Sequence, residues 1–204
     1  MLIELHPLNP EPRKIAQITE CLRDGGIIIY PTDTIYGLGC DISNQKAIEK
    51  VCRIKGVRPE KTNFSFICND LSHITDFVLP LDNPQYRMLK RILPGAYTVI
   101  LKANNMVPKL FKNNKKTVGI RVPNNVIARI LVTELGNPIL STSLKTPDDV
   151  LEYYTDPYEI HQEYGNLVDI VIDGGIGGNI GSTVIDYTTD EIIVLREGAG
   201  EIVW

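Results

Sequence analysis

Apolar side chains recur along the chain at two kinds of spacing, one typical of helices and one typical of short buried strands. Ile15, Ile18 and Leu22 stand at i, i+3 and i+7 between Pro12 and Gly25, which predicts a helix with a glycine stop. The same reasoning predicts further helices around residues 47–54, 86–92, 127–135 and 157–165. Short apolar runs predict strands over residues 27–30, 64–68, 97–101, 118–122, 139–142, 168–172, 183–185 and 192–195.

The predicted helices and strands alternate along the whole chain, without a Pro/Ser-rich linker, a repeat or a low-complexity tract. This order favours one α/β domain over residues 1–204, with a mixed sheet covered by helices. A chain of 204 residues with 43% hydrophobic side chains can bury a core without a disulfide or a metal. In such folds the polar loops that follow strands usually carry the chemistry.

The formal net charge of −4 is an average over unlike parts of the chain. Residues 1–82 carry 9 basic and 11 acidic side chains. Residues 83–133 carry 10 basic side chains and no acidic one, whereas residues 134–204 carry 2 basic and 14 acidic ones. An acid-free stretch of 51 residues indicates a surface that meets an anion.

Several classes of protein are excluded by what the sequence lacks. The four cysteines form no CxxC pair and have no nearby histidine doublet, so metal-ligand and redox spacings are absent. The first residues lack a basic and then apolar signal sequence, and no apolar run approaches ~18 residues. We therefore expect a cytoplasmic protein without a membrane span.

The familiar nucleotide-binding loops are also missing. No GxxxxGK[ST] occurs, and the glycine cluster at residues 174–181 does not give GxGxxG in any register. We expect a mobile loop there rather than a dinucleotide site.

The segment Pro31–Gly39, which reads PTDTIYGLG, directly follows a predicted strand. Thr32 and Thr34 supply hydroxyl groups, and the glycines let the backbone approach a ligand. The alternative is a local Pro-Thr-Asp turn closed by the aspartate side chain.

Two groups of cations stand near predicted strands or helix ends. A basic cluster of Arg53, Lys55, Arg58 and Lys61 ends a predicted helix, where it could bind an anion or only complement the helix dipole. Arg121 lies inside the apolar strand of TVGIRVP, and a buried arginine needs an anionic partner. That partner is either a ligand or a carboxylate of the protein itself.

Hydroxyl side chains at Ser141, Ser143 and Ser182 follow or open strands, and Arg196 stands near the C-terminus. Together these segments supply hydroxyl donors, cations and flexible backbone, but no nucleophile with an adjacent base. This inventory suits chemistry that depends on charge neutralisation and positioning, such as nucleotidyl transfer.

The order and spacing of these motifs resemble the YrdC/YciO family from about Gly25 to Gly200, and most closely its YciO branch. The resemblance rests on the following segments of this sequence: PTDTIYGLG, KGVRP at 55–59, PG at 94–95, TVGIRVP at 117–123, PILSTS at 138–143, STVID at 182–186 and LREG at 195–198.

The resemblance implies a twisted mixed sheet flanked by helices around a concave basic cavity. It also implies synthesis of threonylcarbamoyl-AMP and pyrophosphate from L-threonine, bicarbonate and ATP, with Mg²⁺ accompanying the ATP. That product serves the threonylcarbamoyl modification of tRNA. An alternative within the same resemblance is a non-catalytic protein that binds double-stranded RNA or tRNA with this cavity, and a fold-related enzyme acting on sugar phosphates is a third.

Site residues follow from the resemblance position by position. Thr34 and Arg121 would hold threonine, with Ser141 and Ser182 completing its pocket. Lys55 and Arg58 would be the catalytic cations that neutralise the ATP phosphates. The residues that would face the nucleotide are Thr117, Ser143 and Arg196.

The sequence departs from the family pattern at three positions. Compared with the family pattern, Val57 is an extra residue in the element that reads KGRP, Lys145 replaces an asparagine, and Cys68 stands at the position of a threonine-contacting histidine. These departures lead us to expect a paralogue whose activity is altered or weak.

Overall fold

The structure is a computed structural model that describes residues 1–58, 64–108, 116–144 and 153–204. Its strands form one mixed ten-stranded sheet in the order β1-β8-β2-β3-β7-β4-β6-β5-β9-β10. The strands are β1 Leu2–Glu4, β2 Ile28–Tyr30, β3 Gly37–Asp41, β4 Ser65–Ile67, β5 Tyr97–Lys102, β6 Thr117–Arg121, β7 Ile139–Ser143, β8 Ile170–Asp173, β9 Thr183–Asp186 and β10 Ile193–Arg196.

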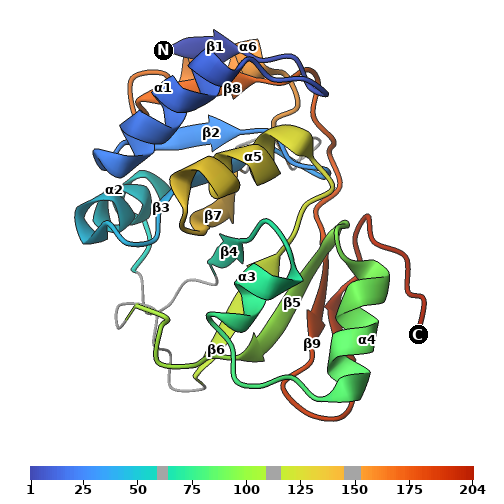
Figure 1. Cartoon of the computed structure of the whole chain (residues 1–204). Helices are drawn as coiled ribbons and strands as arrows, with labels where there is room; N and C mark the ends of the chain where they lie inside the picture. Colours follow the sequence, from blue (N-terminus) through green and yellow to red (C-terminus); the bar gives the residue numbers. More distant parts are fainter. Residues whose placement is uncertain (59–63, 109–115, 145–152) are drawn as a thin grey trace.

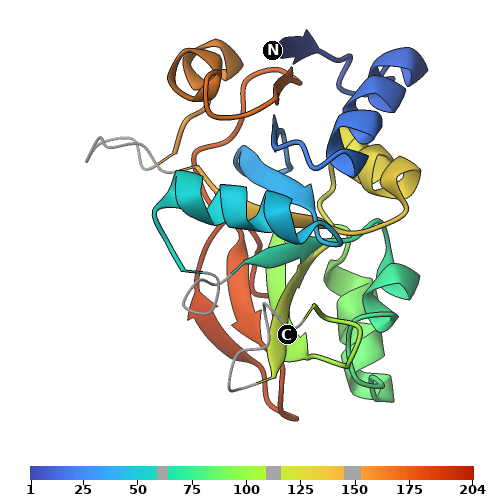
Figure 2. The ribbon, with the colours of Figure 1, turned by 90° about the vertical axis from the view of Figure 1, so that its left-hand side faces the viewer.

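Six helices flank this sheet in the described part of the chain (Figures 1 and 2). The predicted α/β architecture with a mixed, helix-flanked sheet is therefore confirmed. The helices are α1 Pro12–Arg23, α2 Gln45–Lys55, α3 Leu71–Thr75, α4 Asn83–Ile92, α5 Val126–Leu135 and α6 Pro157–Tyr164.

Capping residues fix the ends of two helices. The Asn125 side chain accepts a hydrogen bond from the backbone N–H of Ala128 at the start of α5, and Gly136 ends that helix with φ 79°. Asp156 caps α6 by accepting from the N–H of Tyr158. These local bonds fix where α5 and α6 begin, and α5 in turn borders the site described below.

Apolar side chains form one core on each face of the sheet. On one face, α1 and α5 pack on residues such as Tyr30 and Ile139. On the other face, α2 and α4 pack on residues such as Leu38 and Val99. Figure 1 shows α1 and α5 in front of the strands in the upper half of the molecule, and α3 and α4 in the lower half.

The face under α1 and α5 continues beyond these helices with polar residues. Ile67 and Ile139 belong to the α1/α5 core, whereas Ser65 and Ser141, each two residues along the same strand, line a cavity. Residues two apart in a strand share a face of the sheet. The cavity thus opens on a core face at the place where its helical cover ends.

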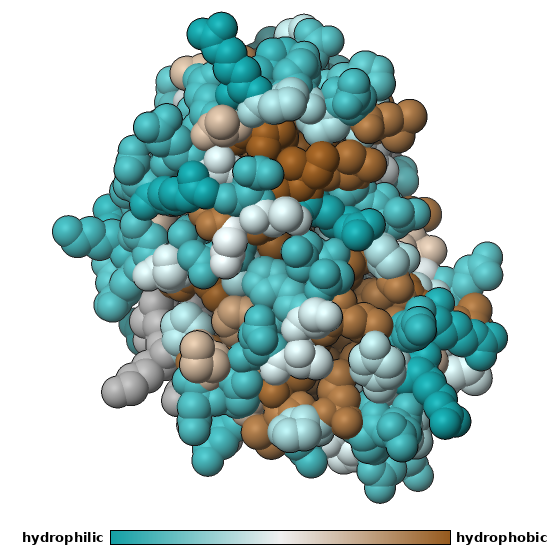
Figure 3. Space-filling view, in the orientation of Figure 1, coloured by the Kyte–Doolittle hydropathy of each residue, from teal (hydrophilic) through white to brown (hydrophobic). Residues whose placement is uncertain are grey.

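Hydrophilic side chains cover most of the face seen in Figure 3, with apolar residues visible in patches between them. Over the described ranges of the chain, no helix is both long and apolar enough to cross a membrane.

Candidate functional site

The cavity has a volume of about 370 Å³ and is lined by residues of seven neighbouring strands or their ends. Six of the residues predicted from the sequence line it: Thr117, Arg121, Ser141, Ser143, Ser182 and Arg196. They come from segments up to 79 residues apart, as the distance from Thr117 to Arg196 shows. Sheet pairing brings them together.

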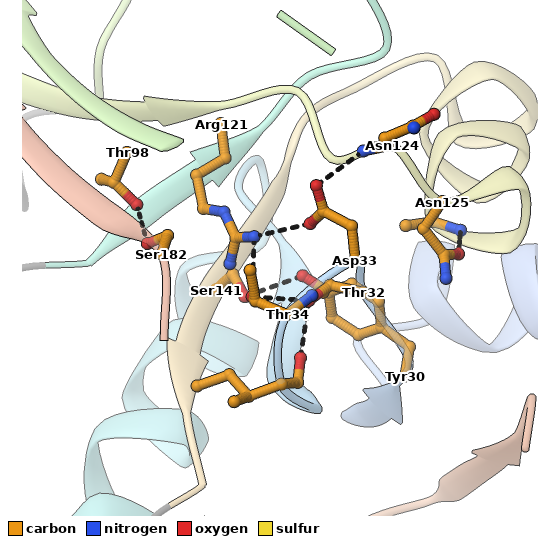
Figure 4. A network of polar contacts seen from close by, with 12 residues as sticks. Tyr30, Thr32, Asp33, Thr34, Thr98, Arg121, Asn124, Asn125, Ser141 and Ser182 are labelled. Atoms are coloured by element: carbon orange, nitrogen blue, oxygen red, sulfur yellow. Dashed lines mark hydrogen bonds and ion pairs between the residues drawn. The ribbon is translucent and has the colours of Figure 1, made fainter. Parts of the chain in front are cut away.

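Arg121 lies at the centre of a buried polar network (Figure 4). Its Nη2 atom donates to Oδ1 of Asp33 at 2.9 Å and to Oγ1 of Thr34 at 3.0 Å. The other carboxylate oxygen of Asp33 accepts from the backbone N–H of Asn124 at 2.9 Å. The ion pair is nearly closed to water, since the two side chains are 9% and 10% exposed. Of the two anionic partners considered for Arg121, the structure shows the carboxylate of the protein.

Arg121 nevertheless keeps a donor for a further partner. Its Nε–H group is buried and finds no acceptor among the described residues. Burial lowers the pKa of this guanidinium from its ordinary value, and the negative charge of Asp33 offsets part of that effect. Because arginine stays protonated in proteins, Arg121 presents a positive, incompletely bonded group at the cavity wall.

Thr34 is held by the loop that precedes β3. The Thr32 hydroxyl donates to the carbonyl of Ile35 at 2.6 Å and accepts from the N–H of Thr34 at 3.1 Å. The hydroxyl groups of Thr32 and Thr34 are also 3.1 Å apart. Asp33 therefore does not close a local turn; its side chain reaches Arg121 and Asn124 instead.

Two hydrogen bonds hold residues of β7 that line the cavity. The Tyr30 hydroxyl donates to Oγ of Ser141 at 2.7 Å, and both groups are buried. Lys55, the last residue of α2, donates to the carbonyl of Ser143 at 2.8 Å. Lys55 thus stands at a helix end and lies next to one of the strands that line the cavity, but it is not itself among the lining residues. Arg58 is exposed and is not among the lining residues.

A third group of polar contacts lies in another part of the cavity and involves Thr98, Ser182 and Arg196. The hydroxyl groups of Thr98 and Ser182 are 2.7 Å apart. Arg196 donates through Nε and Nη2 to the carbonyl of Ser182, and its Nη2 also lies 3.3 Å from the Ser182 hydroxyl. This clamp on Ser182 holds an exposed arginine against the cavity.

β10 contains a β-bulge that directs Arg196. Val194 pairs with Ile185 and Arg196 pairs with Val184, so Leu195 is an extra residue in the ladder. Paired residues share a face of the sheet, and Val184 lines the cavity. The bulge therefore brings Arg196 to the cavity face, whereas an uninterrupted ladder would pair Leu195 with Val184 and turn Arg196 to the opposite face.

The glycine-rich segment 174–181 contains no helix or strand, as expected of a loop, and it packs on the Thr34 segment. The Tyr36 hydroxyl donates to the carbonyl of Gly175 at 2.7 Å. A Cβ atom at Gly178 would lie 2.2 Å from the backbone oxygen of Thr34, and one at Gly177 would lie 2.7 Å from the Tyr36 ring. Glycine is required at Gly178 because the two loops touch there through their backbones, and at Gly177 because the Tyr36 ring occupies the space that a side chain would need.

Replacing Gly178 by alanine is expected to lower the free energy of unfolding by about 1–3 kcal/mol, as overpacking does elsewhere. Urea denaturation measures this loss. Ile176→Ala, which truncates a side chain that is 75% exposed in the same loop, serves as the control and should change little. Equal stability of the two variants would show that the contact between Gly178 and Thr34 is not tight in solution.

Sequence reasoning missed Asp33, Tyr30 and Thr98 as members of the site. Asp33 had a signal, because Arg121 required an anionic partner and Asp33 adjoins the predicted Thr34. Tyr30 and Thr98 were placed in buried strands, and their roles depend on the register between strands, which one sequence does not reveal.

The structure also places two of the three departures from the family pattern. Cys68 is fully buried in the core and does not line the cavity, and burial raises the pKa of its thiol. Val57 lies in the exposed turn after α2, where Gly56 has φ 64°. Lys145, like Lys61 of the basic cluster, lies outside the described residues.

The cavity suits an anionic ligand. No aspartate or glutamate is among its described lining residues, and both oxygens of neighbouring Asp33 accept hydrogen bonds. These residues do not form a carboxylate cage for a divalent cation. Within the described residues, no group of three or more metal-ligating side chains occurs.

The chain is similar to known proteins in sequence and in fold. The chain is 44% identical over 199 residues to the uncharacterized protein YciO of Escherichia coli strain K12, a match that covers 97% of this chain and 95% of that protein. The crystal structure of E. coli YciO matches with a TM-score of 0.91 at 42% identity, over 98% of this chain and 97% of that one.

More distant relatives include named enzymes. The chain is 31% identical over 193 residues to the threonylcarbamoyl-AMP synthase of Bacillus subtilis strain 168, which covers 94% of this chain but 55% of that protein. The crystal structure of P. abyssi Sua5 complexed with L-threonine matches with a TM-score of 0.85 at 25% identity, over 97% of this chain and 57% of that one. Residues 20–198 match the Sua5/YciO/YrdC family, whose description is "Telomere recombination". The chain therefore belongs to the Sua5/YciO/YrdC family.

Proposed function

We propose that this protein is a nucleotidyltransferase of the threonylcarbamoyl-AMP synthase type, converting L-threonine, bicarbonate and ATP into threonylcarbamoyl-AMP and pyrophosphate for tRNA modification. The observation that carries the proposal is Arg121, a buried arginine with an unpaired Nε atom at the wall of a cavity rich in hydroxyl groups. Relatives named threonylcarbamoyl-AMP synthase support it at 30–31% identity, and a related structure was solved with L-threonine. The YciO-like departures from the family pattern favour weak or altered activity.

Arg121 would bind the α-carboxylate of threonine. A carboxylate is the natural partner of a buried guanidinium, because charge-assisted hydrogen bonds are about twice as strong as neutral ones. Thr34 and Ser141 stand beside Arg121, each held in place by a hydrogen bond of its own. Ser182 would close the pocket on the side of Arg196.

Lys55, Arg58 and Arg196 would neutralise the phosphates of ATP. Lys55 lies beside β7 and Arg196 lies at the open side of the cavity, so the two cations border the space next to the threonine pocket. Thr117 and Ser143 line the cavity and would contact the nucleotide. Positioned cations of this kind stabilise the charge that develops on a transferring phosphoryl group.

The reaction balances without a covalent enzyme intermediate. The threonine amine forms a bond to the bicarbonate carbon, and the amine proton leaves with the hydroxyl of bicarbonate as water. A carboxylate oxygen of the resulting carbamate then attacks the α-phosphorus of ATP, and the bond to the β-phosphate breaks to release pyrophosphate. The protein contributes charge and alignment, which agrees with a cavity that offers hydroxyls and cations.

Mg²⁺ enters this proposal as part of the ATP substrate. Because the described cavity residues include no carboxylate, the ion would be held by phosphate oxygens and water rather than by a cage of protein ligands. No step of the mechanism is assigned to a protein-bound metal.

Pyrophosphate release in the presence of ATP, Mg²⁺, bicarbonate and L-threonine tests the proposal. We expect release that depends on both threonine and bicarbonate, with a product whose mass is that of threonylcarbamoyl-AMP. Omitting one substrate at a time gives the control for ATP hydrolysis. Release that is independent of threonine would contradict the proposed substrate, and no release under any condition would contradict the activity.

Binding of double-stranded RNA is the second candidate function, and α4 is the observation that favours it. Arg87, Lys90 and Arg91 are exposed on this helix, inside the acid-free part of the sequence. Arg121, in contrast, is buried and paired, so an RNA backbone would contact α4 rather than the cavity. Retention of a short RNA duplex at ~0.15 M salt, together with absent pyrophosphate release, would favour this function over the first.

A further inference from the structure

The hydroxyl pair of Thr98 and Ser182 is a part of the cavity that the proposed roles above do not fully use. Thr98 lies on β5, between β6 and β9 in the sheet, and is one of the residues that line the cavity. Thr98 and Ser182 are 8% and 3% exposed, and their oxygens are 2.7 Å apart. Figure 4 shows this pair beside Arg121 in one view.

The sheet register places Thr98 between the two arginines of the cavity. Continued by one residue, the register of β5 and β6 places Thr98 opposite Arg121. On its other side Thr98 pairs with Val184, which pairs in turn with Arg196. Directly opposite residues in a sheet have Cβ atoms about 5 Å apart, so a ligand that bound Arg121 through a carboxylate would have Thr98 within reach.

Counting donors and acceptors leaves one hydroxyl hydrogen for a ligand. A hydroxyl has one donor and two acceptor sites. If Thr98 donates to Ser182, the Ser182 oxygen also receives Arg196 Nη2, and the hydrogen of Ser182 remains. If Ser182 donates instead, the hydrogen of Thr98 remains. Either arrangement leaves a single buried O–H without an acceptor among the described residues, beside the proposed carboxylate position.

We propose that Thr98 is a specificity-determining residue that, together with Ser182, forms a hydrogen bond with the side-chain hydroxyl of the amino-acid substrate. The inference rests on the proposed function for the identity of the site as an amino-acid pocket. The site consequently selects a β-hydroxy amino acid over its apolar isostere, because an apolar side chain leaves the buried hydroxyl unsatisfied.

The test compares L-threonine with L-valine, which has nearly the same shape and no hydroxyl. For the wild-type protein, Thr98→Val and Thr98→Ser, both the equilibrium dissociation constant by calorimetry and kcat/KM for pyrophosphate release are measured with each amino acid. Thr98→Val keeps a β-branched side chain suited to a strand and removes only the hydroxyl. Thr98→Ser keeps the hydroxyl and is the matched control.

We expect Thr98→Val to reduce the preference for threonine over valine about 10-fold. The variant should bind and turn over threonine less well, and valine equally well or better. Thr98→Ser should retain the preference within about 3-fold. If Thr98→Val weakens the binding and turnover of both amino acids equally, Thr98 has only a structural role and the proposal is wrong. A variant that fails to fold shifts the decision to Thr98→Ser, whose loss of the preference would also contradict it.

Binding and turnover separate this proposal from the proposed function. Wild-type protein that binds threonine in preference to valine without releasing pyrophosphate would contradict the synthase activity, and the binding ratios would still decide the role of Thr98. Wild-type protein that binds neither amino acid would overturn both.

Discussion

Replacement of Arg121 by alanine is expected to lower kcat/KM for threonine-dependent pyrophosphate release by at least about 30-fold, since truncating one partner of a buried charge pair costs about 2–5 kcal/mol or more. The variant loses the guanidinium that is proposed to bind the carboxylate of threonine. The Thr34 hydroxyl also loses the hydrogen bond that Arg121 donates to it at 3.0 Å. Measured turnover as a function of threonine concentration gives the change. Binding of ATP alone should change far less, because Arg121 is placed in the amino-acid part of the cavity.

The control addresses the charge that this change leaves behind. Arg121→Ala leaves the carboxylate of Asp33, which is 10% exposed, without its cationic partner. Part of the lost activity would therefore reflect a less stable protein. The double variant Asp33→Ala/Arg121→Ala removes both charges, so we expect it to be more stable than Arg121→Ala and equally inactive. Turnover of Arg121→Ala equal to that of the wild type would contradict the assignment of the carboxylate to Arg121.

Asp33→Ala alone is expected to lower the free energy of unfolding by about 3–5 kcal/mol, the usual effect of breaking a buried ion pair from one side. The change leaves the Arg121 guanidinium charged and buried, and it removes the acceptor of the Asn124 N–H. Urea denaturation near pH 7 measures the difference.

Lys14→Ala is the matched control, since Lys14 and Glu11 form an ion pair at 2.7 Å whose side chains are 39% and 46% exposed. An exposed pair of this kind contributes little, because water and salt screen it. We therefore expect a much smaller loss of stability than for Asp33→Ala. Similar losses for the two variants would show that the pair of Asp33 and Arg121 is not sealed from water.

Most of the secondary structure followed from the sequence, because apolar spacing and caps are local properties. The α5 helix illustrates this, since Asn125, its apolar face and Gly136 lie within twelve residues of one another. The prediction failed where a strand carries turn-like residues. β3 reads Gly-Leu-Gly-Cys-Asp, a composition that predicts a loop, yet it pairs on both sides, with β2 and with β7. β1 and α3 were also missed, being three and five residues long.

The glycine content of β3 has a steric cause that a single sequence does not reveal. A Cβ atom at Gly39 would lie 2.4 Å from the carbonyl oxygen of Leu140 on the neighbouring strand. Glycine permits this close approach of two backbones. The sheet therefore requires Gly39, although glycine in the sequence argues against a strand.

The candidate site could be predicted only in part, because several of its contacts join strands that are distant in the sequence. Motifs identified Arg121, Ser182 and Arg196, and the structure brings these residues to one cavity. Their partners Asp33 and Thr98 stand 88 and 84 residues from the groups that they contact, so only the fold defines them. Pairing between distant strands sets these contacts, and the roles of the residues in binding stay predictions.

Because of the bulge at Leu195, the face of the sheet on which Arg196 lies depends on the number of residues in β10. An odd change in that number reverses the face, and an even change keeps it. Inserting or deleting one residue between Val194 and Arg196 would exchange the two faces of the strand and carry the guanidinium away from Ser182, while the ladder itself could still form. A change of two residues would restore the orientation. Sequences of related chains should therefore vary here in even steps wherever the arginine is used, whatever side chains surround it.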